Sequence, residues 1–170
     1  KLNSLSSLLE FCKKRKLITT NPMIFIQKPR YVEESKTNAF TVEEVKQILF
    51  YLETESETLF QENNKSRKYK SAFLNYTILV TLFSVGMRVN ELCELKMKDI
   101  EFSSDFTRLH MTSKGNKEHS PIIHPKASQI IKKYIEQMRM NAKDEDYLFI
   151  RTQSVSNATK LSQVGIYKMV

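Results

Sequence analysis

The chain has 170 residues, 41% of them hydrophobic, with a formal net charge of +8 and a pI near 9.4. This length suffices for one hydrophobic core, or one core and part of a second, and the composition excludes wholesale disorder. No apolar run approaches the ~20 residues of a membrane span, so we expect no membrane partner. The basic excess suits a polyanionic partner, because Lys and Arg displace counterions from phosphates. Charge alone is equally compatible with a basic protein that has no such partner.

The first predicted element is an amphipathic helix over residues 2–16. Its apolar stripe has five members at helical spacing: Leu2, Leu5, Leu8, Leu9 and Cys12. A basic run that complements the helix dipole follows: Lys13, Lys14, Arg15 and Lys16. Because one helix has no partner of its own to pack on, we expect residues 1–26 to be the end of a truncated domain. Residues 27–39 are polar, lack periodicity and are predicted to form an interdomain linker.

Three more helices are predicted in the following segment. Thr41 and Glu44 form a T-x-x-E capping box at the start of the first. Its apolar face consists of Val45, Ile48, Leu49 and Leu52. Residues 53–68 are polar and predict a loop or an irregular helix end. A strongly apolar helix from Tyr69 to Ser84 is then interrupted at Gly86, and a short helix over 88–96 follows.

The hydrophobic period then changes and predicts strands. Three short ones are expected at Ile100–Phe102, Thr107–Met111 and His119–Ile123, the last two joined by a turn at Gly115 and Asn116. Pro125 opens another helix, 148–150 is a short apolar segment, and a final helix begins near Leu161. The predicted fold class is mainly α with a small three-stranded antiparallel sheet.

The stretch from Val85 to Leu95 is the most informative for chemistry. Gly86 permits a sharp turn, and Arg88 is expected in the first turn of the next helix, where unpaired N–H groups favour an anion. A guanidinium there can hold two oxygens of one phosphate, and Glu91 can orient it from the same helix face. A surface Arg–Glu pair without function is the commoner explanation for these two residues alone. The functional hypothesis requires the Arg88 guanidinium to face a buried, phosphate-sized hollow.

A basic turn lies between Thr112 and His119, in T-S-K-G-N-K-E-H. Lys114, at the tip of a strand pair, could reach a neighbouring active site, where its ammonium could stabilise or protonate a departing oxygen. Gly-Asn turns flanked by Lys are also common solvated hairpin ends. Lys114 by itself does not distinguish the two explanations.

Cysteine and histidine residues show no metal-ligand spacing. Cys12 and Cys93 lie in apolar helical patterns without a CxxC partner, so no metal is predicted, while a disulfide remains open. His110, His119 and His124 alternate with strand residues and are expected to be structural or solvent-facing.

Taken together, these stretches resemble the tyrosine recombinase (phage integrase) family of Xer-like site-specific recombinases. The segment from Gly86, G-M-R-V-N-E-L-C-E-L-K-M-K-D-I, is similar to the family signature G-x-R-x-x-E-L-x-x-L with the Asp and apolar residue that follow it. The segment from Ser113, S-K-G-N-K-E-H-S-P, resembles the family's β-hairpin. A-F-T-V-E-E-V resembles the start of its catalytic domain, and L-L-E-F-C with the later N-P the end of its helical core-binding domain. The resemblance covers essentially the whole chain.

The resemblance implies a domain arrangement. Residues 1–26 would be the C-terminal end of the core-binding domain, 27–39 the linker, and 40–170 the N-terminal part of the catalytic domain. It also implies bacterial or phage origin and a cytoplasmic, nucleoid-associated protein.

The resemblance further implies roles for individual residues. Arg88 would contact the scissile phosphate, Glu91 would orient the site, and Lys114 would assist departure of the 5′-oxygen. Further contacts to duplex DNA are expected from Lys13, Lys14, Arg15, Lys117 and His119. In the family a Tyr attacks the phosphate to give a 3′-phosphotyrosine link, so no metal or other cofactor is expected.

The chain also departs from the family pattern. The H-x-x-R element, a later His or Trp and the nucleophilic Tyr are expected beyond a helix like 161–170, so the nucleophile is not present in the chain. The position expected for the nucleophile is not occupied by Tyr134, Tyr147 or Tyr167. Tyr134 is expected in the core. His119 stands where many members carry Arg. We therefore expect this fragment to bind DNA weakly and not to cleave it.

Several functions are compatible with these observations. The first is a recombinase that cuts and rejoins duplex DNA as a synaptic tetramer of full-length protomers. The alternatives are a noncatalytic DNA-binding module of the same fold and a generic helical interaction domain. A type IB topoisomerase shares the chemistry in a different domain context. A downstream H-x-x-R and Tyr would separate the first two, and salt-dependent duplex binding would argue against the third.

Overall fold

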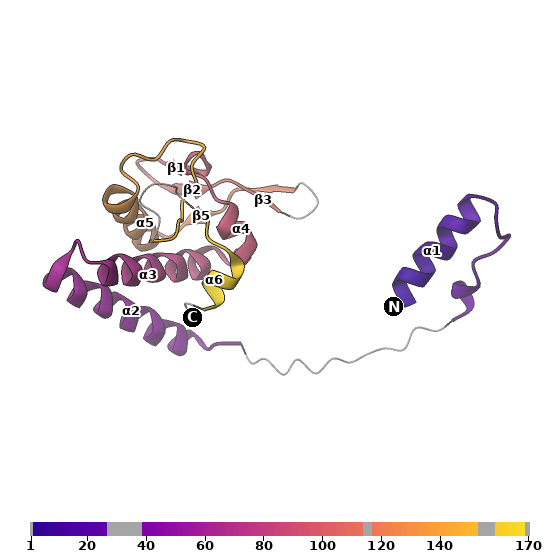
Figure 1. The fold of residues 1–170 in the computed structure, drawn as a ribbon, viewed down its shortest axis with the longest axis horizontal. Coiled ribbons are helices and arrows are strands. Elements are labelled where there is room, and N and C mark those ends of the chain that lie inside the picture. The colour runs from indigo at the N-terminus through magenta and orange to yellow at the C-terminus, as the bar shows by residue number, and fades with distance from the viewer. Residues whose placement is uncertain (1, 27–38, 114–116, 153–158, 169–170) are drawn as a thin grey trace. The chain divides into compact units, whose positions relative to one another are not determined.

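A computed structural model describes residues 2–26, 39–113, 117–152 and 159–168 (Figure 1). The chain divides into two compact units, Lys1–Ala39 and Phe40–Val170. Within the described residues, no helix combines the length and the apolar character needed to cross a membrane.

The first unit contains the helix α1 (Leu2–Lys14) and a single 3-10 turn, η1 (Pro22–Phe25). Asn21 joins them, because its side-chain oxygen accepts a hydrogen bond from the Met23 backbone N–H at 3.0 Å and its amide donates to Glu10 Oε2 at 3.1 Å. Met23 is buried, whereas no side chain of α1 is buried in this described segment. The helix forms as predicted, but its apolar stripe stays largely exposed.

The second unit is mainly helical. Its α-helices are α2 (Val42–Asn63), α3 (Arg67–Val85), α4 (Val89–Glu94), α5 (Pro125–Met138) and α6 (Gln163–Tyr167). The predicted capping box starts α2, since Thr41 Oγ1 accepts from the Glu44 N–H at 3.2 Å and Glu44 Oε2 accepts from the Thr41 N–H at 2.7 Å. The helices α3, α4 and α5 lie where apolar residues at helical spacing predicted them, and α6 lies in the segment where a final helix was expected.

The prediction that residues 53–68 form a loop or an irregular helix end was wrong, because α2 continues as a helix to Asn63. Ser56, Leu59 and Phe60 extend its inner face toward α3, and the Phe60 ring meets the Tyr69 ring at 5.3 Å between centroids. Most other polar residues of this stretch are exposed on the solvent-facing side of the same helix. The connection between α2 and α3 is therefore only residues 64–66.

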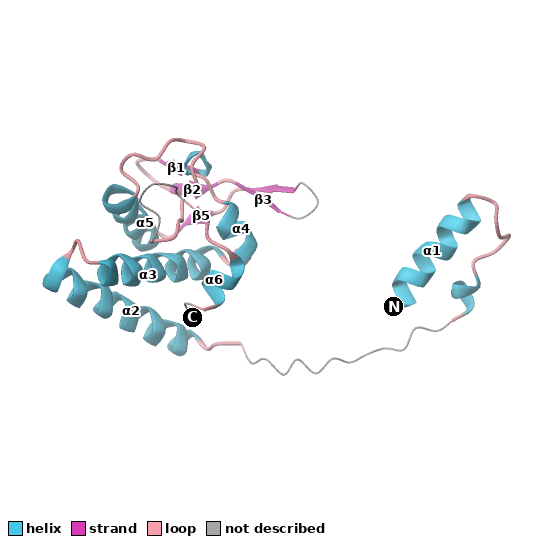
Figure 2. Ribbon diagram, viewed as in Figure 1, coloured by secondary structure: helices cyan, strands magenta, loops and turns pink. Residues whose placement is uncertain are grey.

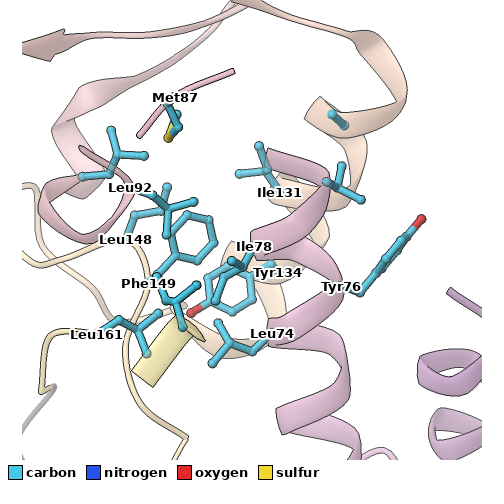
Figure 3. Close-up of a cluster of buried hydrophobic side chains, with 14 of the residues drawn as sticks. Leu74, Tyr76, Ile78, Met87, Leu92, Ile131, Tyr134, Leu148, Phe149 and Leu161 are labelled. Atoms are coloured by element: carbon cyan, nitrogen blue, oxygen red, sulfur yellow. The ribbon is translucent and has the colours of Figure 1, made fainter. Parts of the chain in front are cut away.

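The core of the second unit is built around α3, which packs against α2 on one side and α5 on the other (Figure 2). Figure 3 shows side chains of α3, α4, α5 and the 148–150 segment meeting there. The Tyr134 and Phe149 rings lie 5.4 Å apart between centroids, and both side chains are buried. Burial raises the pKa of Tyr134 to about 12. Tyr134 is thus a core residue, as predicted.

The segments predicted to form three strands form five shorter strands, which belong to two separate sheets. A three-stranded antiparallel sheet has the order β1–β2–β5, formed by Ile100–Phe102, Thr107–Leu109 and Ile122–Ile123. A separate hairpin pairs β3 (Met111–Ser113) with β4 (Lys117–His119). The chain leaves the first sheet at His110, whose backbone N–H donates to the Asp99 carbonyl at 2.7 Å. The predicted class, mainly α with a small three-stranded antiparallel sheet, is confirmed.

Candidate active site

The candidate site begins at the turn between α3 and α4. Gly86 closes α3 in the left-handed region, with φ 67° and ψ 28°, and its N–H donates to the Leu82 carbonyl at 2.8 Å. A Cβ at this position would meet none of the described atoms within 4 Å, so the glycine is favoured by backbone conformation and not by crowding. The turn brings Arg88 to the N-cap of α4, one residue before the helical turn in which it was predicted.

Arg88 and Glu91 form the predicted pair. Arg88 Nη1 donates to Glu91 Oε1 at 3.0 Å, and the Arg88 backbone N–H donates to Glu91 Oε2 at 2.8 Å. The Glu91 side chain is only 11% exposed, so one sheltered carboxylate holds both the start of the helix and the guanidinium. The pairing is as predicted, and the role of Glu91 in orienting a catalytic site stays a prediction.

The expectation that the Arg88 guanidinium faces a buried hollow was wrong. Its side chain is 75% exposed, because an N-cap in extended conformation projects outside the helix and this guanidinium folds back onto Glu91. A hollow of about 170 Å³ does lie beside α4, but Glu91, Glu94 and Asp99 line it. Such a carboxylate-rich surface repels a phosphate. Arg88 is thus reachable from solvent and is not enclosed.

The C-terminal segment supports the polar face of α4. Gln163 Nε2 donates to Asn90 Oδ1 at 2.9 Å, and the Lys160 ammonium forms an ion pair with Glu94. Sequence reasoning missed both contacts, because partners 73 and 66 positions apart leave no local signal. Cys93, the neighbour of Glu94 on α4, is buried in the core, and burial raises the pKa of its thiol.

The hairpin residues are only partly described. Lys114, the predicted catalytic lysine, lies outside the described residues. Lys117 belongs to β4, with its backbone opposite Ser113, and His119 is exposed at the other end of that strand, opposite Met111. The predicted DNA contacts of Lys117 and His119 stay predictions.

The other two histidines are exposed, as expected. His110 contacts Ser120 Oγ through Nδ1 and Glu101 Oε2 through Nε2, each at 3.1 Å. His124 is the N-cap of α5 and accepts from the Lys126 N–H at 3.2 Å.

Within the described ranges, no group of three or more His, Cys, Asp or Glu side chains is arranged to hold a metal ion, and the thiols of Cys12 and Cys93 are free.

The remaining predicted DNA-binding residues belong to the first unit. Lys13 and Lys14 occupy the last turn of α1, and Arg15 follows with its guanidinium 5.3 Å from the centroid of the Phe11 ring. All three side chains are exposed and available to an anion. Their contact with DNA stays a prediction.

Comparison with known proteins identifies the family of the chain. The sequence profile described as "Phage integrase family" matches residues 38–170, which include the Gly86 turn, Arg88 and Glu91. The chain belongs to the phage integrase family. Among the curated members of this family, it is 28% identical over 156 residues to a tyrosine recombinase XerC of Bacillus pumilus and 26% identical over 170 residues to a XerD of Halalkalibacterium halodurans. These alignments cover 88% and 98% of this chain but 46% and 50% of the relatives, so the chain spans about half their length.

Solved structures of family members share the fold. A XerH site-specific recombinase bound to its difH substrate matches with a TM-score of 0.59 at 20% identity, covering 79% of this chain and 35% of that one. A XerA recombinase matches with a TM-score of 0.56 at 17% identity, covering 99% of this chain and 50% of that one. The second unit therefore has the fold of tyrosine recombinase catalytic domains.

Proposed function

We propose that the protein containing this chain is a site-specific recombinase that breaks and rejoins duplex DNA through a 3′-phosphotyrosine intermediate. Membership of the phage integrase family supports this function, as does the guanidinium that Glu91 holds beside the Gly86 turn. We propose residues 1–26 as the end of a core-binding domain, 27–39 as the linker and 40–170 as part of the catalytic domain. The active form would be a synaptic tetramer on duplex DNA in the cytoplasm, at the nucleoid.

The proposed reaction exchanges one phosphodiester for another. A tyrosine hydroxyl oxygen attacks the phosphorus atom as its proton is lost to solvent, and the bond to the 5′-oxygen breaks, with its electron pair leaving on that oxygen. Lys114 would supply the proton that the 5′-oxygen takes up, and Arg88 would stabilise the added negative charge on the phosphate oxygens. The reverse attack by a 5′-hydroxyl rejoins the strand without an external energy source. We assign the role of this nucleophilic tyrosine to none of the tyrosines in the present chain.

The family match carries the proposal, because Arg88 does not face the buried hollow that the sequence hypothesis required. Within the site, the supporting observation is the manner in which Arg88 is held. Glu91 engages one nitrogen of the guanidinium, and the 75% exposure of the side chain leaves its other N–H groups open to solvent. A guanidinium that is anchored on one edge and free on the other can grip a phosphate as a fork with little loss of side-chain entropy. Glu91 also accepts a hydrogen bond from the Arg88 backbone N–H at the start of α4, so the guanidinium is held in a defined orientation relative to that helix.

Several observations support DNA as the partner. The chain carries a net charge of +8, and exposed cations gather at the end of α1. The solved relatives include a recombinase bound to its difH substrate and a transposon integrase in complex with circular intermediate DNA. We propose that Lys13, Lys14 and Arg15, together with Lys117 and His119, contact the DNA backbone.

Substitution of Arg88 tests the proposal. In the intact protein, Arg88→Ala should abolish cleavage of a suicide substrate while duplex binding stays within about threefold, because the guanidinium acts mainly on the transition state. Arg67→Ala is the matched control, since Arg67 is an exposed arginine at the start of α3. It should cleave at the wild-type rate.

Two outcomes would count against this function. Cleavage by Arg88→Ala at the wild-type rate would remove Arg88 from the active site. Tight duplex binding by the intact wild-type protein without any covalent intermediate would favour the alternative, a noncatalytic DNA-binding module of the same fold.

A further inference from the structure

A second site candidate lies near the start of α3, away from Arg88. A cavity of about 520 Å³ opens between α3, the end of α5 and the loops that follow α5. Lys70 in the first turns of α3 lines it, and about 22 Å of helix separates Lys70 from the Gly86 turn. This volume is in the range of cavities that bind small organic ligands. We call it the α3–α5 cavity.

The main cationic side chain of the α3–α5 cavity is Arg139, which is only 8% exposed. Its Nη2 donates to the Tyr147 carbonyl at 2.8 Å, and its Nε has no hydrogen-bond partner among the described residues. No described carboxylate forms an ion pair with it. A buried guanidinium without an anionic partner is costly, because its desolvation is not offset by a counter-charge.

The position of Arg139 at the end of α5 stabilises part of its positive charge. It follows the last turn of α5, where the helix dipole favours a cation, and its backbone N–H donates to the Ile135 carbonyl at 2.9 Å. A neutral carbonyl and a helix end hold the guanidinium in place, but they do not supply a full negative charge. An anion bound in the cavity would supply that charge.

Two further cations share the cavity with Arg139. Lys70 and Arg151 both line it and are exposed at its rim. The acidic side chain in the described lining is Asp146, whose Oδ2 already accepts a hydrogen bond from the Lys143 N–H at 2.8 Å. The cavity therefore carries an excess of positive charge contributed by three separate elements.

The rest of the lining limits the class of ligand. Met138 and Ile150 provide apolar surface beside the cations, and Asn141 provides an amide. Arginine forks and a lysine together suit a phosphate group better than a single carboxylate, because a phosphate offers more acceptor oxygens and up to twice the charge. We propose that the α3–α5 cavity binds an organic phosphate of nucleotide size, with the phosphate at Lys70, Arg139 and Arg151 and the less polar part against Met138 and Ile150.

NMR titration of this chain tests the site. ADP, added at constant ionic strength, should cause saturable amide shifts at Arg139, Asn141 and Arg151, and inorganic phosphate should bind the same residues more weakly. Lys70→Glu should weaken ADP at least about tenfold, the loss expected for a charge-assisted hydrogen bond. Lys68→Glu is the matched control, because Lys68 lies in the same turn of α3, is exposed, and is not in the cavity lining. Both variants change the net charge equally, and only the first should lose binding.

The outcomes separate the possibilities. Equal weakening by both variants, shifts spread over the basic surface, or no saturable shift up to about 10 mM ADP would overturn the proposal. A short DNA duplex that displaces ADP would identify nucleic acid as the source of the phosphate. A duplex that leaves ADP bound would identify a free nucleotide. Either result supports the cavity as a phosphate site, and neither depends on recombinase activity.

Discussion

The helices α1 and α3 both carry apolar residues at helical spacing, but the structure uses them differently. In α3 ten side chains are buried between α2 and α5, whereas α1 buries none within the described residues. Leu8 of α1 is 57% exposed, while Phe149, against the α3 core, is 1% exposed. The comparison shows that an apolar stripe predicts a helix, and that stabilisation by burial depends on neighbours from elsewhere in the chain.

Large-to-small substitutions provide the strongest test of this comparison. Phe149→Ala should lower the free energy of unfolding of the second unit by about 3–5 kcal/mol, because it removes a buried ring against Tyr134 and leaves a cavity. Leu8→Ala should change the free energy of unfolding by no more than about 0.5 kcal/mol, as an exposed position does. Urea denaturation followed by circular dichroism measures both. A loss above about 1 kcal/mol for Leu8→Ala would mean that α1 packs in solution.

A backbone substitution sharpens the comparison inside the second unit, at a position where burial plays no part. Gly86→Ala should destabilise that unit by about 1–2 kcal/mol, because a Cβ disfavours the left-handed conformation at φ 67° even with open space around it. Gly86→Asn should be less destabilising, since Asn tolerates this region. Thermal unfolding of the two variants gives the order. An equal loss for both would point to a packing role that the described contacts do not contain.

The smallest effect on the free energy of unfolding is expected for the exposed ion pairs of Glu145. Like the exposed apolar stripe of α1, these groups are not buried, so they stabilise the fold only slightly. Hydrogen bonds from Lys96 and then Lys98 lower the pKa of Glu145 to about 2, below its ordinary value of 4.5. Because the folded-state pKa is depressed, the stabilisation is complete above about pH 4.5 and is lost as the pH falls through about 2. The difference in unfolding free energy between wild type and Glu145→Gln should therefore be small at pH 6 and vanish near pH 2.

The control for this pH series is Glu62→Gln, at an exposed glutamate in α2. Its difference from wild type should not follow the same pH course. High salt should reduce the Glu145 effect by screening. A Glu145 difference that grows toward pH 2 would contradict the assigned direction.

Much of the candidate site was predictable, because its contacts are local. The turn at Gly86 and the pairing of Arg88 with Glu91 join positions within a few residues, so spacing alone suggests them. The support of α4 by Gln163 and Lys160 was not predictable, since it joins distant segments. The exposure of Arg88 was predicted wrongly for the same reason, because a hollow is formed by several elements and not by one.

The sequence by itself determined the starts of the helices, the apolar faces and the family motif around Arg88, because caps and stripes act through neighbours in the same turn. It also contained the continuation of α2, in the spacing of Ser56, Leu59 and Phe60 after Leu52. Only the tertiary structure decided which stripes are buried, where the strands break into two sheets, and that Arg139 enters a cationic cavity. Burial, solvent exposure and counter-charge are properties of segments that meet in space, and no local pattern records them.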